Sequence, residues 1–311
     1  MLISFIVPFY NVEQYIEQCI RSICQQDIPN DNYEVICIND CSPDNSVDII
    51  KKLQSEYPQI RLIEHNKNKK LGGARNTGLK IAKGDYVWFI DSDDYIPTNI
   101  LKGISKTLLS ENIDFLHFNY YELRGENLVE IQNNQDIEVI PGVDLFLHPS
   151  MNWSRDHIVA WVKIFNRQFL INNSLFFAED VMYEDNDYAF LCYFFAKRVK
   201  HISKSLYIYR CNPGSITRIN YTDVHIAYWL RLCKRLINVH QIIKSQNSNI
   251  RYSEEINTFI RNIIYQIISV YAKIDVKSKR KARQYIKNEI TKKYKPYMSF
   301  KNYWKLKLGI I

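Results

Sequence analysis

The chain has 311 residues, of which 46% are hydrophobic and 14% aromatic; this composition excludes a disordered protein and allows a sizeable buried core. None of its seven cysteines is part of a CxxC pair, so we expect reduced, mostly buried cysteines and no disulfide framework. The first residues lack the features of a signal peptide, and no uncharged apolar run reaches about 18 residues. We therefore expect a cytoplasmic protein that does not span a membrane.

The net charge of +8 is unevenly distributed along the chain. The stretch from Lys273 to the end carries 13 Lys and Arg residues against 2 acidic residues, a balance of +11, whereas the preceding residues have a balance of −3. The body of the protein is therefore nearly neutral, and its tail is basic.

The first part of the chain alternates between strands and amphipathic helices. Strands are predicted at residues 2–8, 33–38, 60–63 and 86–90, with a helix after each of the first three. Asn11 is expected to cap the first helix, and the GGARN segment is expected to form a loop that leads into the third helix. Such alternation predicts β-α-β units with right-handed crossovers and a mostly parallel sheet.

Polar signals follow all four predicted strands. They are Pro8 with Tyr10, Asp40, the GGARN loop, and the pair Asp91 and Asp93. In open parallel sheets, ligands bind outside the carboxyl ends of the strands, so these four signals converge on one edge. Convergent polar groups at that edge are the default hypothesis for a ligand site.

The segment DYVWFIDSDDYI, residues 85–96, is an apolar strand that ends in Asp91, Asp93 and Asp94. Carboxylates this close raise one another's pKa unless a cation lies between them. Mg²⁺ and Mn²⁺ commonly use one or two such carboxylates together with a substrate phosphate. The alternative is a solvated acidic turn in which Asp94 or Thr98 caps the next helix.

The glycine-rich segment does not match either common phosphate-binding signature. Gly73 and Gly78 have the GxxxxG spacing of a phosphate loop, but Leu79 and Lys80 follow in place of Lys and Ser or Thr. The dinucleotide pattern GxGxxG is also absent. The segment can still bring backbone amides and Arg75 to a phosphate or a base. Tight packing of a helix on the sheet would equally explain Gly78.

The later elements are predicted with less regular spacing. A helix at 98–110 precedes a strand from Asp114, and the polar stretch that follows is either a hairpin or an exposed loop. Glu184 and Asp185 begin a helix, where acidic residues in the first turn commonly interact favourably with the helix dipole. Further helices are expected at 223–244 and 256–271, with His240 as a packed helix residue. The apolar face expected for the helix at Glu184 comprises Tyr188, Leu191, Cys192 and Phe195.

Several segments occur in the order seen in family 2 glycosyltransferases, and the chain resembles that family from residue 2 to about 218. The resemblance implies an α/β protein with a GT-A, Rossmann-like, mostly parallel sheet flanked by helices, and a glycosyltransferase domain at 1–220. The helical spacing and basic charge of the remaining residues predict a C-terminal helical extension with a basic amphipathic tail at 221–311. The segments are PFYNVEQYIEQCIRSI, YEVICINDCSPDNS, GGARNTGLKIAKGDYVWFIDSDD, WVKIFN, MYED and YRCNPGSIT.

The resemblance also implies an activity: inverting transfer of a sugar from a nucleotide diphosphate, usually UDP, to a hydroxyl of a glycan or lipid-linked acceptor in surface polysaccharide biosynthesis. Asp185 resembles the catalytic base, with Glu184 beside it. Asp93 resembles a ligand of Mn²⁺ or Mg²⁺, and Asp91 the residue that faces the ribose. The other residues implied in donor binding are Pro8, Tyr10, Glu13, Asp40, Gly72, Gly73, Arg75 and Lys163.

One position departs from the family pattern. Asn212 stands where many relatives have a histidine that can complete the metal shell, and an amide oxygen is a weaker ligand for Mn²⁺ than imidazole. The departure favours an alternative function, a non-catalytic nucleotide-sugar-binding or scaffolding module. The presence of Asp91, Asp93 and Asp185 argues against that alternative.

The basic tail interleaves Lys and Arg with aromatic and aliphatic residues. Three interpretations compete, namely a solvated end, a nucleic-acid patch and a peripheral anchor on an anionic membrane surface. The interleaved apolar residues favour the membrane surface, so we expect peripheral association with the cytoplasmic face of the inner membrane and no nucleic-acid partner.

Overall fold

The structure is a computed structural model that describes residues 3–133, 135–149, 151, 158–179, 184–212, 221–245, 250–290, 292–299, 302, 303 and 305. The chain forms two compact units, residues 1–212 and 213–311. Within the described ranges, no helix is long and apolar enough to cross a membrane.

The first unit is built on a nine-stranded sheet with the order β3-β2-β1-β4-β8-β5-β9-β7, in which β6 pairs with β5. The first four strands are parallel and match the predicted ones; they are β1 (Ile3–Phe9), β2 (Tyr33–Asn39), β3 (Ile60–Glu64) and β4 (Tyr86–Phe89). Every residue of β1, β2 and β4 is buried, as expected for parallel strands with helices on both faces.

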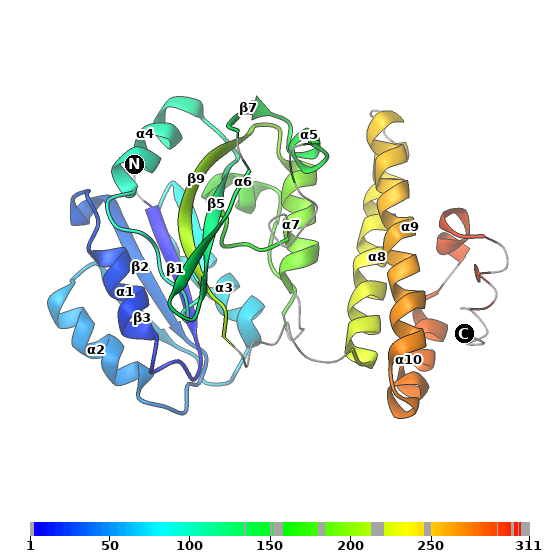
Figure 1. The fold of residues 1–311 in the computed structure, drawn as a ribbon, viewed down its shortest axis with the longest axis horizontal. Helices are drawn as coiled ribbons and strands as arrows, with labels where there is room; N and C mark the ends of the chain where they lie inside the picture. The colour runs from blue at the N-terminus through cyan, green and yellow to red at the C-terminus, as the bar shows by residue number, and fades with distance from the viewer. Residues whose placement is uncertain are drawn as a thin grey trace. The chain divides into compact units, whose positions relative to one another are not determined.

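Helices connect these strands as predicted (Figure 1). Their apolar spacing buries one face of each on the sheet, for example Ile16, Ile20 and Ile23 of the first helix. A short 3₁₀ turn, η1 (Asn30–Asn32), precedes β2. The helices are α1 (Ile16–Cys24), α2 (Ser46–Glu56), α3 (Lys70–Ile81) and α4 (Leu101–Glu111).

The second half of the sheet is mixed. Strand β8 lies antiparallel between β4 and β5, while β5 and β9 are parallel. The hairpin of β5 and β6 resolves the polar stretch after β5 in favour of the hairpin. The remaining elements of this unit are β5 (Phe115–Arg124), β6 (Asn127–Ile131), β7 (Ile137–Ile140), α5 (Gly142–Phe146), β8 (Lys163–Asn166), α6 (Arg167–Asn172), α7 (Glu184–Phe195) and β9 (Val199–Arg210).

Some local predictions were wrong. Asn11 does not cap α1, because the helix begins at Ile16 with Tyr15 at its N-cap position. The Asn11 backbone turns instead with φ 56°, and its N–H donates to Ser42 Oγ at 2.8 Å. The GGARN segment is not a loop, since α3 already begins at Lys70. Helix α4 begins after Ile100, so neither Asp94 nor Thr98 is its N-cap.

The packing prediction for Gly78 is confirmed, whereas the buried face predicted for α7 is only partly correct. A Cβ atom on Gly78 would lie 2.4 Å from Ile6 Cγ2, which confirms close packing of α3 on β1 as a reason for this glycine. Phe195, which was expected on the buried face of α7, is 40% exposed, whereas Tyr188 and Cys192 are buried as expected.

The second unit contains the helices α8 (Asp223–Ser245), α9 (Ile250–Lys273) and α10 (Val276–Glu289), followed by the 3₁₀ turn η4 (Lys292–Tyr297). Helices α8 and α9 run side by side (Figure 1). The prediction for His240 is confirmed, because its ring is buried, with Nδ1 2.6 Å from the Tyr297 hydroxyl and Nε2 2.7 Å from Ser253 Oγ.

Candidate active site

Arg75 of α3 is the centre of the charged cluster at the carboxyl edge of the parallel strands. Its side chain is fully buried, and Nη2 lies 2.6 Å from Asp91 Oδ1, just beyond β4. Nη1 lies 2.9 Å from Glu184 Oε1 and also pairs with Asp185, at the start of α7. The guanidinium carbon lies 5.1 Å from the Phe177 ring centroid. One cation therefore joins three carboxylates from two segments that are distant in sequence.

The carboxylates of this cluster are only partly neutralised by Arg75. Burial raises the pKa of Asp185. The neighbouring carboxylates of Glu184 and Asp91 raise this pKa further, whereas Arg75 lowers it. The Asp185 side chain is still 18% exposed. A carboxylate with a raised pKa and access to solvent can accept a proton near neutral pH, which is what a general base requires.

Asp93 lies beside Asn212, as the prediction of a shared metal site requires. Asn212 Nδ2 donates to Asp93 Oδ2 at 3.2 Å. Burial, and secondarily Asp91, raise the pKa of Asp93 to about 6, and the opposing effects of the Asn212 hydrogen bond and of Arg210 do not cancel this rise. Asp93 and the amide oxygen of Asn212 are oxygen ligands of the kind that Mg²⁺ and Mn²⁺ accept.

The described side chains alone do not form a full metal centre. In the described part of the chain, no group of three or more His, Cys, Asp or Glu side chains is arranged to hold an ion. Mg²⁺ is commonly held by one or two carboxylates together with substrate phosphates. The residues present therefore fit a divalent cation that shares its ligands with a bound diphosphate.

Asp94, the third carboxylate of the acidic segment, is a structural residue. It is 1% exposed; its Oδ2 accepts a hydrogen bond from the Tyr207 hydroxyl at 2.8 Å, and its Oδ1 accepts one from the Arg210 backbone N–H at 2.7 Å. The Tyr207 hydroxyl in turn accepts from the Asp91 backbone N–H at 3.1 Å, and Arg210 Nε donates to the Asp93 carbonyl at 2.9 Å. The end of β9 thereby fixes the turn that presents Asp91 and Asp93.

Sequence reasoning did not identify Tyr207 and Arg210 as residues that support the site. Arg210 belongs to the YRCN segment, so its place in a motif was visible, but its contact with the acidic turn was not. Tyr207 had no such signal, because its partner Asp94 lies 113 residues earlier in the chain.

Asp40 follows β2 and is held in a polar network. Its Oδ1 accepts from the Lys69 backbone N–H at 2.8 Å and lies 2.8 Å from His65 Nδ1. The other ring nitrogen of His65 lies 2.9 Å from Thr77 Oγ1 of α3. His65 was not predicted; its position directly after β3, at the same edge of the sheet, is the signal that could have found it.

The three predicted residues near the end of β1 lie in different environments. Pro8 is a buried residue of β1, and Tyr10 is 51% exposed, so its ring is accessible to a ligand. Glu13 Oε2 accepts from the backbone N–H of Asn45 at 3.0 Å and from its side-chain amide at 2.8 Å. Glu13 thus holds the start of α2 in this structure.

Gly72 lets the chain before α7 approach α3. A Cβ atom on Gly72 would lie 2.3 Å from the Ala178 carbonyl oxygen and 3.2 Å from Glu184 Cγ, and one on Gly73 would lie 2.6 Å from Lys69 Cβ.

Lys163 of β8 is fully buried; its Nζ donates to the Val159 carbonyl at 2.7 Å and lies 5.2 Å from the Tyr193 ring centroid. Lys163 is therefore not exposed to a ligand in this structure.

The mixed α/β sheet flanked by helices agrees with the GT-A fold. The family model for glycosyl transferase family 2 matches residues 4–170, and the chain belongs to that family.

Curated relatives extend the match beyond the family model. The uncharacterised glycosyltransferase EpsJ of Bacillus subtilis is 31% identical over 228 residues, which are 71% of this chain and 64% of that protein. The poly(ribitol-phosphate) beta-N-acetylglucosaminyltransferase TarS of Staphylococcus aureus is 30% identical over 211 residues, 67% of this chain and 35% of that protein. This chain thus matches between about a third and two thirds of the length of these relatives.

Solved structures agree on the fold. The TarS fragment 1–349 of S. aureus, in complex with UDP-GlcNAc, superposes with a TM-score of 0.76 at 19% identity, covering all of this chain and 91% of that one. The mannosyltransferase PcManGT of Pyrobaculum calidifontis, in complex with GDP-Man and Mn²⁺, gives a TM-score of 0.52 at 17% identity over 99% and 85% of the two chains.

Proposed function

We propose that this protein is an inverting glycosyltransferase that moves a sugar from a nucleotide-diphosphate donor, a UDP-sugar, to a hydroxyl of a glycan or lipid-linked acceptor in surface polysaccharide biosynthesis. The observation that carries the proposal is the convergence of Asp91, Glu184 and Asp185 on the buried Arg75, beside Asp93. Complexes of TarS with UDP and with UDP-GlcNAc support the choice of donor.

Asp185 acts as the general base in this proposal. The acceptor hydroxyl oxygen bonds to the anomeric carbon, the bond from that carbon to the diphosphate breaks, and the hydroxyl proton passes to the Asp185 carboxylate. The raised pKa of Asp185 suits this role, because a general base is most effective when its pKa is near the working pH. Arg75 orients Asp185 through their ion pair, and Glu184 shares the same guanidinium.

The donor is held by the residues at the edge of the sheet. The exposed Tyr10 ring offers a stacking surface for the base, and Asp91 faces the ribose. Asp40 is 4% exposed and its Oδ1 is already bonded to Lys69 and His65, so the base would use its other carboxylate oxygen as the acceptor. Asp93 and Asn212 are the residues that would hold a divalent cation, Mn²⁺ or Mg²⁺. Such a cation, when bound, stabilises the negative charge that develops on the leaving group.

The second unit provides a surface for peripheral attachment to an anionic membrane. Helix α10 exposes Lys277, Arg280 and Lys281 together with Val276, which is 85% exposed. Cations interleaved with apolar side chains favour the lipid interface, where each Lys or Arg adds about 1 kcal/mol on anionic lipid. This attachment suits an enzyme whose acceptor is linked to a lipid.

Calorimetric titration of UDP into the protein, with and without Mn²⁺, tests the donor site. We expect UDP affinity to fall at least about tenfold when Mn²⁺ is omitted or when Asp93 is replaced by alanine, because the cation would offset the repulsion between the Asp93 carboxylate and the UDP diphosphate. Transfer from UDP-sugars to acceptor hydroxyls then tests turnover. Absence of UDP binding under all conditions would contradict the proposed donor.

A further inference from the structure

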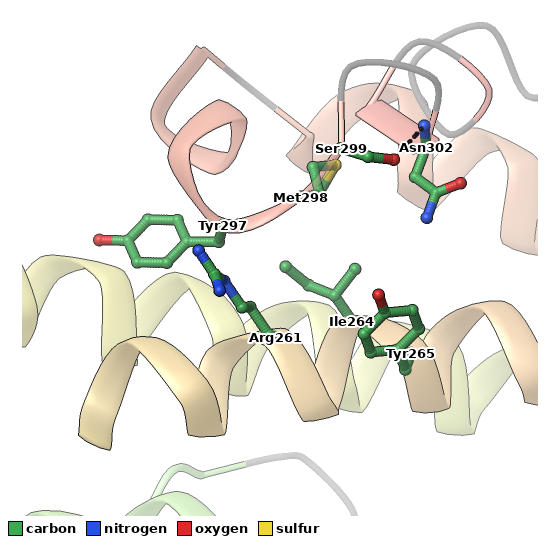
Figure 2. A pocket seen from close by; sticks show the side chains of 7 residues that line it. All are labelled: Arg261, Ile264, Tyr265, Tyr297, Met298, Ser299 and Asn302. Atoms are coloured by element: carbon green, nitrogen blue, oxygen red, sulfur yellow. Dashed lines mark hydrogen bonds between the residues drawn. The ribbon is translucent and has the colours of Figure 1, made fainter. Parts of the chain in front are cut away.

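The second unit contains a pocket that the proposed transfer reaction does not use. The pocket has a volume of about 300 Å³. Figure 2 shows Arg261, Ile264 and Tyr265 on α9, facing Tyr297, Ser299 and Asn302 from the segment after α10. Pockets of this size lie at the small end of the range that holds small ligands, about 300 to 1,000 Å³.

The walls of the pocket are anchored in the core of the unit. Ile264 is 2% exposed and Tyr297 5% exposed. The Tyr297 hydroxyl is held 2.6 Å from His240 Nδ1, so its ring lies in a fixed position. The Asn302 backbone N–H donates to Ser299 Oγ at 3.2 Å, which links two of the residues opposite α9. Part of the pocket lining is therefore fixed by the core of the unit.

Polar groups of the pocket are available to a ligand. Arg261 is exposed, and no described residue forms an ion pair or hydrogen bond with its guanidinium. The side-chain amide of Asn302 likewise has no hydrogen-bond partner among the described residues. Tyr265 is 63% exposed, which leaves an aromatic ring accessible beside the cation.

These groups together select one class of ligand. A free guanidinium binds phosphate through two parallel hydrogen bonds, an arrangement stronger than bonds between neutral groups. An accessible tyrosine ring offers a flat apolar surface together with a hydroxyl. Ser299 and the Asn302 amide add hydrogen bonds suited to hydroxyl groups. The complementary ligand carries a phosphate and a short hydroxylated carbon skeleton.

We propose that this pocket binds a sugar-phosphate or polyol-phosphate unit of the acceptor polymer. The inference rests on the proposed glycosyltransferase function, which supplies a reason for a polymeric acceptor. A second binding site on the same chain raises the effective concentration of the polymer at the first, so a weak pocket strengthens binding of a long acceptor more than of a short one.

Ligand-observed NMR titration of the full chain tests the pocket with glycerol 3-phosphate and glucose 1-phosphate as probes. Glucose and inorganic phosphate are the comparison compounds, because each carries only one part of the proposed ligand, the hydroxylated skeleton or the phosphate. We expect the phosphorylated probes to bind, and Arg261→Gln and Tyr265→Ala each to weaken them about tenfold. The control Lys106→Gln removes an exposed cation of α4, outside the pocket and outside the basic surface of α10, and leaves binding unchanged.

Three results would overturn the inference. One is equal binding of the probes by the wild type and Arg261→Gln; another is inorganic phosphate binding as tightly as the phosphorylated probes, which indicates a simple anion site. The third is that Arg261→Gln loses binding to phosphatidylglycerol vesicles but not to the soluble probes, which indicates a lipid headgroup.

UDP titration of the same variants separates this inference from the proposed function. Both pocket variants should bind UDP like the wild type, since the residues assigned to the donor lie in the first unit. A chain that binds no UDP but shows probe binding dependent on Arg261 would contradict the donor proposal alone. A chain that binds UDP but gives one of the three overturning results would contradict the pocket alone.

Discussion

The two units of the chain carry their charges in opposite environments. In the first unit, Arg75 is fully buried against Asp91, Glu184 and Asp185. In the second unit, the cations of α10 lie on the surface. Charges in a low-dielectric interior interact strongly and shift one another's pKa, whereas exposed charges are screened by water and salt. The first arrangement suits chemistry at a fixed point, and the second suits attraction to a polyanionic partner.

Asp185→Asn gives the largest expected effect, because it removes the proposed base from the buried cluster. We expect sugar transfer to fall about 10²- to 10⁴-fold, with UDP affinity nearly unchanged. Steady-state transfer assays together with UDP calorimetry measure the two quantities. Asp48→Asn, an exposed carboxylate of α2, is the control and should leave both at the wild-type level. Unimpaired transfer by Asp185→Asn would remove this residue from the role of base.

Arg75→Met tests directly whether burial decides the strength of an ion cluster. Removing the buried cation leaves three uncompensated carboxylates, and breaking a buried pair in this way costs about 3–5 kcal/mol of unfolding free energy. The matched control is Arg21→Met, since Arg21 pairs with Glu17 at 2.9 Å and Glu56 at 2.7 Å but lies near the surface. Surface pairs contribute about 0–1 kcal/mol.

Urea denaturation of both variants at pH 5 and pH 8 measures this difference. Arg75→Met should lose more stability at pH 8, because the remaining carboxylates repel one another when ionised. Equal losses for Arg75→Met and Arg21→Met at pH 8 would show that the burial of Arg75 does not strengthen its ion pairs.

The parallel half of the fold was predictable because its strands are continuous apolar runs that end in polar turns. The burial of β1, β2 and β4 follows directly from those runs. The GGARN segment was mispredicted for a physical reason. Glycine was taken as a sign of a loop, whereas Gly72 is a helical residue that lets the Ala178 carbonyl approach α3.

The position of Arg75 could not be predicted from local pattern. Its two partners on α7 lie 109 and 110 residues later in the chain, and nothing in the GGARN segment distinguishes a fully buried arginine from an exposed one. The same limit applies to the pocket of the second unit, which joins Arg261 and Tyr265 with Tyr297, Ser299 and Asn302. Such sites depend on tertiary contacts that periodicity does not encode.

Asp93→Asn should stabilise the fold at high pH, in contrast to Arg75→Met. The pKa of Asp93 is raised from 3.8 to about 6, so the folded state binds more protons than the unfolded state between these values. The Asp93 contribution to stability therefore falls as the pH rises through this window, and the full penalty is present above about pH 6. Replacing the carboxylate should add up to about 3 kcal/mol at pH 8 and little at pH 4.

Thermal and urea denaturation between pH 4 and pH 8 measure the gain. Mn²⁺ should stabilise the wild type in the presence of UDP and should stabilise Asp93→Asn less, because the variant lacks a charged ligand. The control is Asp136→Asn; hydrogen bonds from Ser203 lower the pKa of Asp136, so its loss should not stabilise the protein at pH 8. A lower stability of Asp93→Asn than of the wild type at pH 8 would contradict the assigned penalty.

Lys281→Gln gives the smallest expected effect and tests the exposed half of the comparison. Deleting α10 is a poor test, because Ala282 and Ile286 are buried and their removal would open the core of the unit. Loss of one exposed cation should weaken binding to anionic vesicles by about 1 kcal/mol, or roughly fivefold, with the effect shrinking as salt is added. The matched control Lys106→Gln removes an exposed lysine of α4 and the same net charge. Co-sedimentation with phosphatidylglycerol vesicles measures both variants. Equal weakening by the two substitutions would mean that net charge alone, and not the surface of α10, attracts the protein to the membrane.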